Sequence, residues 1–391
     1  MNKPIYFLLL AQFLSAFADN AILFTVIAIV MHAHQQASWY VPALQSVFLI
    51  AFVVLAPWVG GFADHYPKSR VLIIANLIKA AGACLLLLQV DAMWAYCLVG
   101  LGAAIYSPAK YGILPELADH QHLMKANSWI EGSTILAILL GMVVGAKVAD
   151  YSTHWALIGI IALFILSASV SLLIPARKPI IAAATATGSR VVAFVRQIGQ
   201  FFTTPQSRFA MLGGALFWAA AATLRVLIVA FAPLVLNLGS ASEIAELTLF
   251  LALGIIVGSA LVPGMIPLEH LRRARIPAYL MGLLIVALSF THSLWAARAV
   301  LFFIGMMGGL FIVPINATLQ EQGQHSIGSG SAVALQGFFQ NIAMLFALGS
   351  YTYAMRLEVQ PILAMQCLGV LVFIGTFGIT LHLRDTPDPR H

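Results

Sequence analysis

Residues 60–70, which read GGFADHYPKSR, separate two strongly apolar runs of the chain. The runs on either side, roughly 40–62 and 71–90, are each about as long as the ~20 residues that a helix needs to cross the hydrocarbon core of a membrane. A short charged segment between two such runs is typical of a loop that joins two membrane-spanning helices. Because the same alternation recurs along the chain, it predicts an all-α integral membrane protein.

The composition supports this fold class. Of the 391 residues, 61% are hydrophobic and only 9% are charged, whereas soluble domains carry about 25% charged residues. The formal net charge is +6, but the bases fall between the apolar runs, which argues against a nucleic-acid partner. All three cysteines lie inside apolar stretches. This placement argues against a disulfide framework and against a cysteine-rich metal site.

The apolar runs predict twelve membrane-spanning helices. They are roughly residues 5–31, 40–62, 71–90, 94–114, 127–149, 155–174, 209–236, 244–263, 276–291, 295–318, 330–355 and 359–382. The first run is too long for a signal peptide, lacks a small-residue cleavage site and carries Asp19 in its middle. The alternative is eleven or thirteen spans, which would place the two termini on opposite sides.

The basic residues predict the orientation. If the N-terminus is cytoplasmic, most Lys and Arg residues outside the spans fall on the cytoplasmic side, and only Lys147, Arg298 and Arg356 fall at the outer ends. Such a bias follows the rule that cytoplasmic loops carry an excess of Lys and Arg. We therefore expect both termini to be cytoplasmic.

The longest stretch outside the spans divides the chain into a six-helix half (1–174), a cytoplasmic linker (175–208) and a second six-helix half (209–391). Within the linker, apolar residues from Val191 to Phe202 repeat at helical spacing. Two interpretations are open: an amphipathic helix on the anionic inner leaflet, or an ordered linker helix.

The two halves resemble each other weakly at a nearly constant offset. Gly102 corresponds to Gly308 at an offset of 206 residues, and Phe13 and Gly145 correspond to Phe217 and Gly349 at 204. Two halves of six helices with the same orientation imply a pseudo-two-fold axis along the membrane normal. This arrangement is typical of the major facilitator fold, in which the substrate site lies near the midplane between the halves.

Four ionisable residues lie deep within the predicted spans: Asp19, Lys79, Lys110 and Arg225. Such residues cost about 2.5–3.5 kcal/mol each on insertion scales and normally face a cavity. One acid against three bases suits an anionic ligand, and the guanidinium of Arg225 is well shaped to bind phosphate through two nitrogens. At an offset of 204, Arg225 corresponds to Ala21, close to Asp19. An acid and a base at similar depth suit a zwitterion, such as an amine plus a phosphate.

Structural alternatives exist for each of these charges. Asp19 and Arg225 could neutralise each other, and Lys79 could pair with an acid. Lys110 could extend its ammonium to the membrane surface or pair with Glu131, which we expect about a turn inside its helix. Asp19 could also be a proton-coupling carboxylate.

Residues 60–70 resemble the loop motif of the major facilitator superfamily. In that motif a glycine is followed four residues later by an aspartate and then by spaced bases, here Gly60, Asp64, Lys68 and Arg70. The glycine permits close approach of two helices. The resemblance implies that Asp64 caps the start of the eleventh span, near residues 328–331, and forms a cytoplasmic gate with the bases. The alternative is a generic basic loop.

Several motifs are missing from the sequence. The chain contains no G-x-x-x-x-G-K-[ST], no H-E-x-x-H and no G-x-S-x-G. His120 and His122 have no Cys or further His nearby, so we expect neither a metal nor a cofactor. A membrane enzyme would need a buried nucleophile or a paired-carboxylate site, and a passive scaffold would not offset the cost of buried charges. We therefore expect a transporter and not an enzyme.

Three strings carry a more specific resemblance: AQFLSAFADN at residues 11–20, GAAIYSPAKYGIL at 102–114 and VPINA at 313–317. They resemble bacterial lysophospholipid transporters of the major facilitator superfamily. The resemblance implies flipping of lysophosphatidylethanolamine, lysophosphatidylglycerol and related lysolipids from the outer to the inner leaflet of the bacterial inner membrane. It also implies a partner, a cytoplasmic acyltransferase/acyl carrier protein synthetase that re-acylates them.

By this resemblance, charges within the membrane serve the lipid head group. The candidate binding residues are Asp19, Arg225, Lys110, Gln12, Asn20, Glu131, Tyr111 and Gln340. We expect Arg225 and Lys110 to hold the phosphate, and Asp19 to orient the amine or glycerol. Gln340 stands where the family is expected to carry Glu, which would shift selectivity away from ethanolamine.

Two questions stay open at this point. A lipid tail needs a lateral opening in the protein, and small residues such as Gly141 and Gly145 could provide one or could serve close helix packing. The rival function is proton-coupled export of a small amphipathic drug, for which Asp19 would be the coupling residue.

Overall fold

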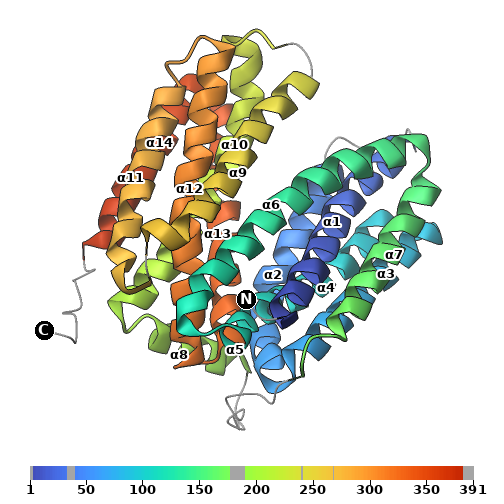
Figure 1. The fold of residues 1–391 in the computed structure, drawn as a ribbon. Helices are drawn as coiled ribbons and strands as arrows, with labels where there is room; N and C mark the ends of the chain where they lie inside the picture. Colours follow the sequence, from blue (N-terminus) through green and yellow to red (C-terminus); the bar gives the residue numbers. More distant parts are fainter. Residues whose placement is uncertain (1–2, 33–39, 177–189, 239–240, 267, 382–391) are drawn as a thin grey trace, which may run out of the picture. The chain divides into compact units, whose positions relative to one another are not determined.

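The computed structural model describes residues 3–32, 40–176, 190–238, 241–266 and 268–381. Every regular element in these ranges is a helix (Figure 1). The helices are α1 (Lys3–His32), α2 (Tyr40–His65), α3 (Lys68–Leu87), α4 (Ala92–Gly112), α5 (Leu114–Leu117), α6 (His120–Tyr151), α7 (Thr153–Ser171), α8 (Arg190–Phe201), α9 (Pro205–Val235), α10 (Ala241–Met265), η1 (Leu268–Ala274), α11 (Arg275–Leu288), α12 (Leu294–Gln324), α13 (Ser329–Arg356) and α14 (Pro361–Thr380).

Each of the twelve predicted spans corresponds to one helix, which confirms the predicted fold class. Within the described ranges, eleven helices are long and apolar enough to cross a membrane. The exception is α11, whose 14 residues fall short of the ~20 that a span needs. The apolar run there was expected to reach residue 291, but the helix ends at Leu288 and the chain turns, with the Ser289 hydroxyl donating to the Val286 carbonyl at 2.7 Å.

The sixth helix of the structure starts earlier than its apolar run. α6 begins at His120, so Glu131 lies about three turns inside the helix and not one turn as predicted. The difference arises because hydropathy marks the apolar part of a helix, whereas the backbone continues as a helix through the polar residues before it.

The helix predicted in the linker is present as α8; residues 177–189 of that linker lie outside the described residues. Phe194 is buried, and its ring packs against that of Phe338 at 5.3 Å between centroids. Val192 and Val195 are exposed. α8 therefore has one apolar side against the protein and another that is open, which is compatible with both interpretations of this segment.

The chain forms two compact units. The first comprises residues 1–198 and 320–338, and the second comprises residues 199–319 and 339–391. The end of α12 and the start of α13 thus pack within the first unit, although they follow the sequence of the second.

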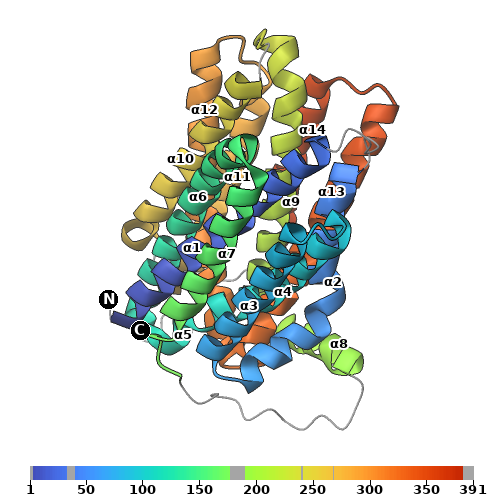
Figure 2. The same ribbon diagram turned by 90° about the vertical axis from the view of Figure 1, so that its right-hand side faces the viewer.

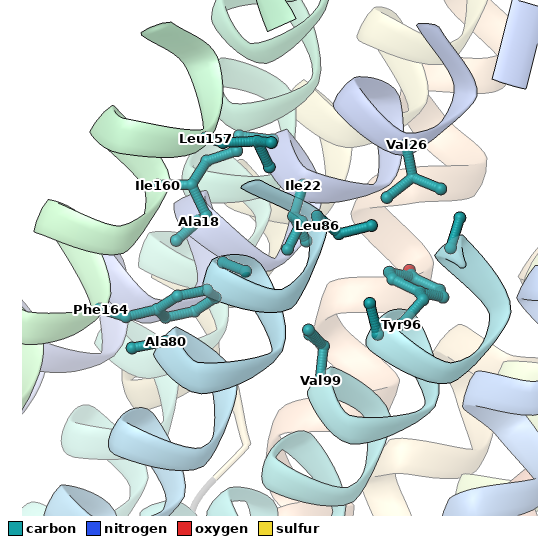
Figure 3. Close-up of a cluster of buried hydrophobic side chains, with 14 residues drawn as sticks. Ala18, Ile22, Val26, Ala80, Leu86, Tyr96, Val99, Leu157, Ile160 and Phe164 are labelled. Atoms are coloured by element: carbon teal, nitrogen blue, oxygen red, sulfur yellow. The ribbon is translucent and has the colours of Figure 1, made fainter. Parts of the chain in front are cut away.

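In the first unit, α3 and α4 lie side by side, α7 lies along α1 and α3, and α6 lies along α1 (Figures 1 and 2). A cluster of buried apolar side chains joins α1, α3, α4 and α7 (Figure 3). Ile22 and Val26 come from α1, Val99 and Tyr96 from α4, and Phe164 from α7. The cluster fixes α1, α3, α4 and α7 relative to one another. It thereby also fixes the positions of the polar residues on these helices.

Two glycines bring α6 close to α1. A Cβ at Gly141 would collide with the carbonyl oxygen of Phe17, and a Cβ at Gly145 would lie 2.5 Å from the Cα of Ala21. These glycines were considered either for a lateral opening or for close helix packing. Their geometry in the structure is that of close helix packing.

In the second unit, α14 lies along both α9 and α11. α10 and α12 approach each other through glycines on both helices. A Cβ at Gly254 would collide with the carbonyl oxygen of Phe302, and one at Gly305 would collide with that of Leu251. Small residues spaced four apart are a frequent means of packing helices in membranes.

Candidate functional site

A buried ion pair joins α1 to α3. Lys79 Nζ lies 2.7 Å from Asp19 Oδ2, and the side chains of Lys79 and Asp19 are 0% and 22% exposed. The acid that neutralises Lys79 is therefore Asp19. Of the alternatives considered, Lys79 takes the structural one, and the Asp19 carboxylate is already paired within its own unit.

A chain of hydrogen bonds surrounds this pair. Lys79 Nζ donates to Ser15 Oγ at 2.9 Å, Ser15 Oγ donates to Asn76 Oδ1 at 2.8 Å, and Asn76 Nδ2 donates to Ser167 Oγ at 2.9 Å. The ammonium also lies 4.4 Å from the centre of the Tyr106 ring. These residues could not be recognised from the sequence, because a lone Ser, Asn or Tyr in an apolar helix gives no signal until its partners are known.

One oxygen of the Asp19 carboxylate is unused. Oδ1 is buried and has no hydrogen-bond partner in the described part of the chain. Buried polar atoms are nearly always hydrogen-bonded, so an exception calls for an explanation such as a ligand or an ion. Asp19 can thus be paired with Lys79 and still accept a bond from the amine or hydroxyl of a ligand.

A second polar cluster joins α4 to α6. The Tyr111 hydroxyl donates to Glu131 Oε1 at 2.8 Å, and Lys110 Nζ lies 4.1 Å from the centre of the Tyr111 ring. Lys110 is only 8% exposed, so it does not extend to the membrane surface as one alternative proposed. It also experiences the charges of Glu131, Lys79 and Asp19.

Glu131 changes the predicted charge balance. It is 3% exposed and must be counted with Asp19 among the deep acids. Against Lys79, Lys110 and Arg225 this leaves an excess of one base, where the sequence analysis counted two. The correction follows from the early start of α6, which places Glu131 deeper in its helix than predicted.

Gln12 and Asn20 on α1 make bonds within the protein. Gln12 Nε2 donates to Ser133 Oγ at 3.0 Å, and Gln12 Oε1 accepts from Thr134 Oγ1 at 3.2 Å. The Asn20 side chain donates back to the carbonyl of Ala16 at 2.8 Å. Both ends of the Gln12 amide are thus occupied in joining α1 to α6.

Two candidates of the second unit have unoccupied polar groups. Arg225 on α9 is exposed, and Gln340 on α13 is half-buried. Neither side chain hydrogen-bonds or forms an ion pair with any residue that the structure describes. Since a charge is costly in a membrane helix, an Arg without a protein partner is available to a ligand.

Asp64 caps the start of α13. Its Oδ1 accepts from the backbone N–H of Gly330 at 2.8 Å, and its Oδ2 accepts from that of Ser331 at 2.7 Å. A carboxylate at a helix N-terminus satisfies donors that lack intrahelical partners and faces the positive end of the helix dipole. Gly328, at φ +100°, supplies the turn before the helix in a conformation that favours glycine.

Further contacts complete this junction. Lys68 Nζ lies 3.4 Å from Asp64 Oδ1 and donates to Glu116 Oε1. A Cβ at Gly60 would lie 2.8 Å from the Cα of Ser331. Arg70, predicted to act with Lys68, is exposed, and its side chain makes no hydrogen bond or ion pair with the described residues. The acid that pairs with Lys68 is Glu116 of α5, the short helix that follows α4.

Two direct links reinforce the junction. Asn127 of α6 and Gln320 of α12 exchange two amide hydrogen bonds, at 3.0 and 2.8 Å. The Ser329 hydroxyl donates to the carbonyl of Gly112 at 2.8 Å. We refer to the contacts made by Asp64, Lys68, Glu116, Asn127, Gln320 and Ser329–Ser331 as the α13 latch.

Asp64→Asn is expected to weaken the α13 latch without changing its shape. Hydrogen bonds to a charged group contribute about 1.5–3 kcal/mol each, so loss of the charge should raise the population with α13 detached by about tenfold or more. The measurement is the rate at which a water-soluble maleimide modifies a single cysteine introduced as Ala334→Cys, beside Gly60. Asp91→Asn, at the exposed cap of α4, is the control, and equal rates in both variants would contradict the role of Asp64.

Comparisons with known proteins agree with this architecture. The sequence matches the Major Facilitator Superfamily over residues 8–348. Among solved structures, the E. coli fucose:proton symporter FucP superposes with a TM-score of 0.78 at 13% identity, covering 98% of this chain and 99% of that one. The human organic anion transporter MFSD10 superposes with a TM-score of 0.75 at 12% identity, covering 97% and 100%. These similarities concern the fold alone.

Closer relatives are found by sequence. A protein of Photorhabdus laumondii named lysophospholipid transporter LplT is 40% identical over 90% of this chain and 88% of its own length. A protein of the same name from Salmonella gallinarum is 40% identical over 92% and 90%. The chain therefore belongs to the Major Facilitator Superfamily and, within it, to the family of these lysophospholipid transporters.

Proposed function

We propose that this protein transports lysophospholipids, among them lysophosphatidylethanolamine and lysophosphatidylglycerol, from the outer to the inner leaflet of the bacterial inner membrane. The family of the chain and its series of apolar helices support this function. The proposed mechanism is alternating access. The proposed orientation, with both termini cytoplasmic, accords with the distribution of Lys and Arg between the spans. The observation that carries the proposal is Arg225, a cation on a membrane helix with no partner among the described residues.

Arg225 and Lys110 are proposed to bind the phosphate of the head group. A guanidinium donates two parallel hydrogen bonds to a phosphate, and an ammonium adds charge without fixed direction. Tyr111 and Glu131 hold Lys110 in place. The free Oδ1 of Asp19 accepts from the amine or the glycerol hydroxyl of the lipid.

The amide candidates take two different roles in this proposal. Gln12 and Asn20 act through α1, because their amides are bonded within the protein. Gln340 contacts the head group directly, because its amide is free. An amide cannot neutralise an ammonium as a carboxylate would, which favours glycerol head groups relative to ethanolamine at this position.

The α13 latch is proposed to close the cytoplasmic side while the lipid enters from the outer leaflet. Its release then opens the way to the inner leaflet. A cytoplasmic acyltransferase/acyl carrier protein synthetase is the proposed partner, since a lysolipid delivered to the inner leaflet is the substrate of an acylation reaction.

Reconstitution tests the function. Purified protein in liposomes, with labelled lysophosphatidylethanolamine in the outer leaflet and no ion gradient, is expected to move the label to the inner leaflet. Protein-free liposomes are the control, and loss of accessibility to an external phospholipase is the readout. If movement requires an imposed proton gradient, downhill flipping is wrong. If none occurs with or without the gradient, proton-coupled export of amphipathic drugs becomes the better proposal.

A further inference from the structure

An apolar cavity of the second unit is lined by α9, α13 and α14, and it is partly open, because Phe346 and Leu371 of its lining are 77% and 62% exposed. Its volume is about 680 Å³, within the range of roughly 300–1,000 Å³ that is usual for ligand pockets. α9 contributes Ala215 and Ala219, α13 contributes Phe346 and Ala347, and α14 contributes Leu368. All residues that line it belong to one unit, and none of them carries a charge.

Small side chains keep this cavity open. Ala215, Ala219 and Ala347 face it from two helices, and Gly375 faces it from the third. The hydroxyl of Thr223, one of the few polar groups of the lining, donates to the carbonyl of Ala219 at 2.8 Å. The lining is thus almost entirely apolar, and an apolar pocket of this size suits a hydrocarbon chain.

The corresponding place in the first unit is polar. At the offset of 204 residues that relates the two halves, Ala219 corresponds to Ser15 and Thr223 corresponds to Asp19. Ser15 and Asp19 are the partners of Lys79 in the buried network. The same region of the repeat is therefore polar in one unit and apolar in the other.

About one turn before the cavity, α13 carries the polar residue Gln340, which is not part of the lining. Gln340 lies three and seven residues before Ala343 and Ala347, which puts it on the face of α13 that lines the cavity. Its amide has no partner among the described residues. A space for hydrocarbon with a free polar group at its edge suits an amphiphile with one chain.

We propose that this cavity holds the acyl chain of the lysophospholipid during transport. The inference rests on the proposed function and adds to it the part of the protein that binds the tail. The single acyl chain of the lysolipid makes apolar contacts in the cavity, while the head group of the lipid stays bound to the polar residues proposed above. The small residues of the lining therefore determine how much of the chain is accommodated.

Filling the cavity tests this inference. Ala347→Trp places an indole in the cavity, and Leu345→Trp, two residues away on the same helix and outside the lining, is the matched control. Reconstituted protein is given lysophosphatidylethanolamine with a hexadecanoyl chain that ends in a photoreactive diazirine. Ala347→Trp is expected to slow transport about tenfold, since displacing two methylene groups from apolar contact weakens binding by about that factor.

Mass spectrometry after irradiation gives a second readout. In the wild-type protein, adducts are expected on the cavity-facing residues of α9, α13 and α14, and Ala347→Trp should remove most of them. Monodispersity in detergent monitors folding; if Ala347→Trp does not fold, Ala219→Leu replaces it.

The outcomes separate this inference from the function. If the wild type transports lysolipid but the adducts lie elsewhere, or if both Trp variants transport alike, the cavity does not bind the tail and the function stands. If the wild type transports nothing, the function fails and the inference fails with it.

Discussion

Arg225→Ala is expected to abolish lysolipid transport and to leave a folded protein in the membrane. The two expectations have one cause. The side chain of Arg225 has no hydrogen bond or ion pair within the described residues, so its removal leaves no protein group without a partner. The lost interaction is with the phosphate of the substrate. Truncating one partner of a desolvated, hydrogen-bonded charge pair costs about 2–5 kcal/mol, which is roughly thirtyfold or more in affinity.

Two further variants sharpen this experiment. Arg225→Lys keeps the charge but loses the planar fork, so its transport rate should lie between those of the wild type and Arg225→Ala. Arg273→Ala removes an exposed base of η1 and should transport like the wild type. A normal rate of flipping by Arg225→Ala in liposomes would remove Arg225 from the site.

Lys79→Met is expected to be the most destabilising of these substitutions. It leaves the Asp19 carboxylate without its counter-ion in a largely buried network, and breaking a buried pair by removing one partner costs about 3–5 kcal/mol. The measurement is the thermal unfolding temperature of the purified protein in detergent, with Lys147→Met as a control at an exposed position of α6.

The double variant Asp19→Asn with Lys79→Met separates stability from transport. Replacing both partners of a buried pair is often close to neutral, so the unfolding temperature should recover most of the loss. If the free oxygen of Asp19 serves the lipid, the recovered protein will still transport poorly. A double variant that transports normally would show that Asp19 acts only as the partner of Lys79.

The helices could be predicted from the sequence because hydrophobic length is a local property. The segment at residues 60–70, most of which is helical in the structure, also predicted the contact with the start of α13, since its spacing of Gly60 and Asp64 resembles a known motif. The motif specifies bases near the aspartate, here Lys68 and Arg70, but does not specify which acid faces them. Glu116 is that acid, and only the packing of α4 brings it to Lys68.

The internal pairing of the site could not be predicted in the same way. Sixty residues separate Asp19 from Lys79, and whether they meet depends on the rotation and depth of two helices. That geometry is decided by the packing of residues such as Ile22 and Phe164 in the apolar cluster. The cavity in the second unit was equally inaccessible, because its volume depends on the separation of three helices.

The α13 latch has a consequence for biosynthesis. Asp64 binds backbone groups 266 and 267 residues further along the chain. At about 5–20 residues per second, a ribosome needs tens of seconds to supply them after Asp64 has emerged. During that interval the carboxylate of Asp64 and the side-chain amide of Asn127 have no partners. The nascent N-terminal helices are then exposed to quality-control proteases and to chaperones. A gene split between residues 198 and 199 would therefore yield an incomplete N-terminal product that is stabilised only when its C-terminal counterpart is made in the same cell.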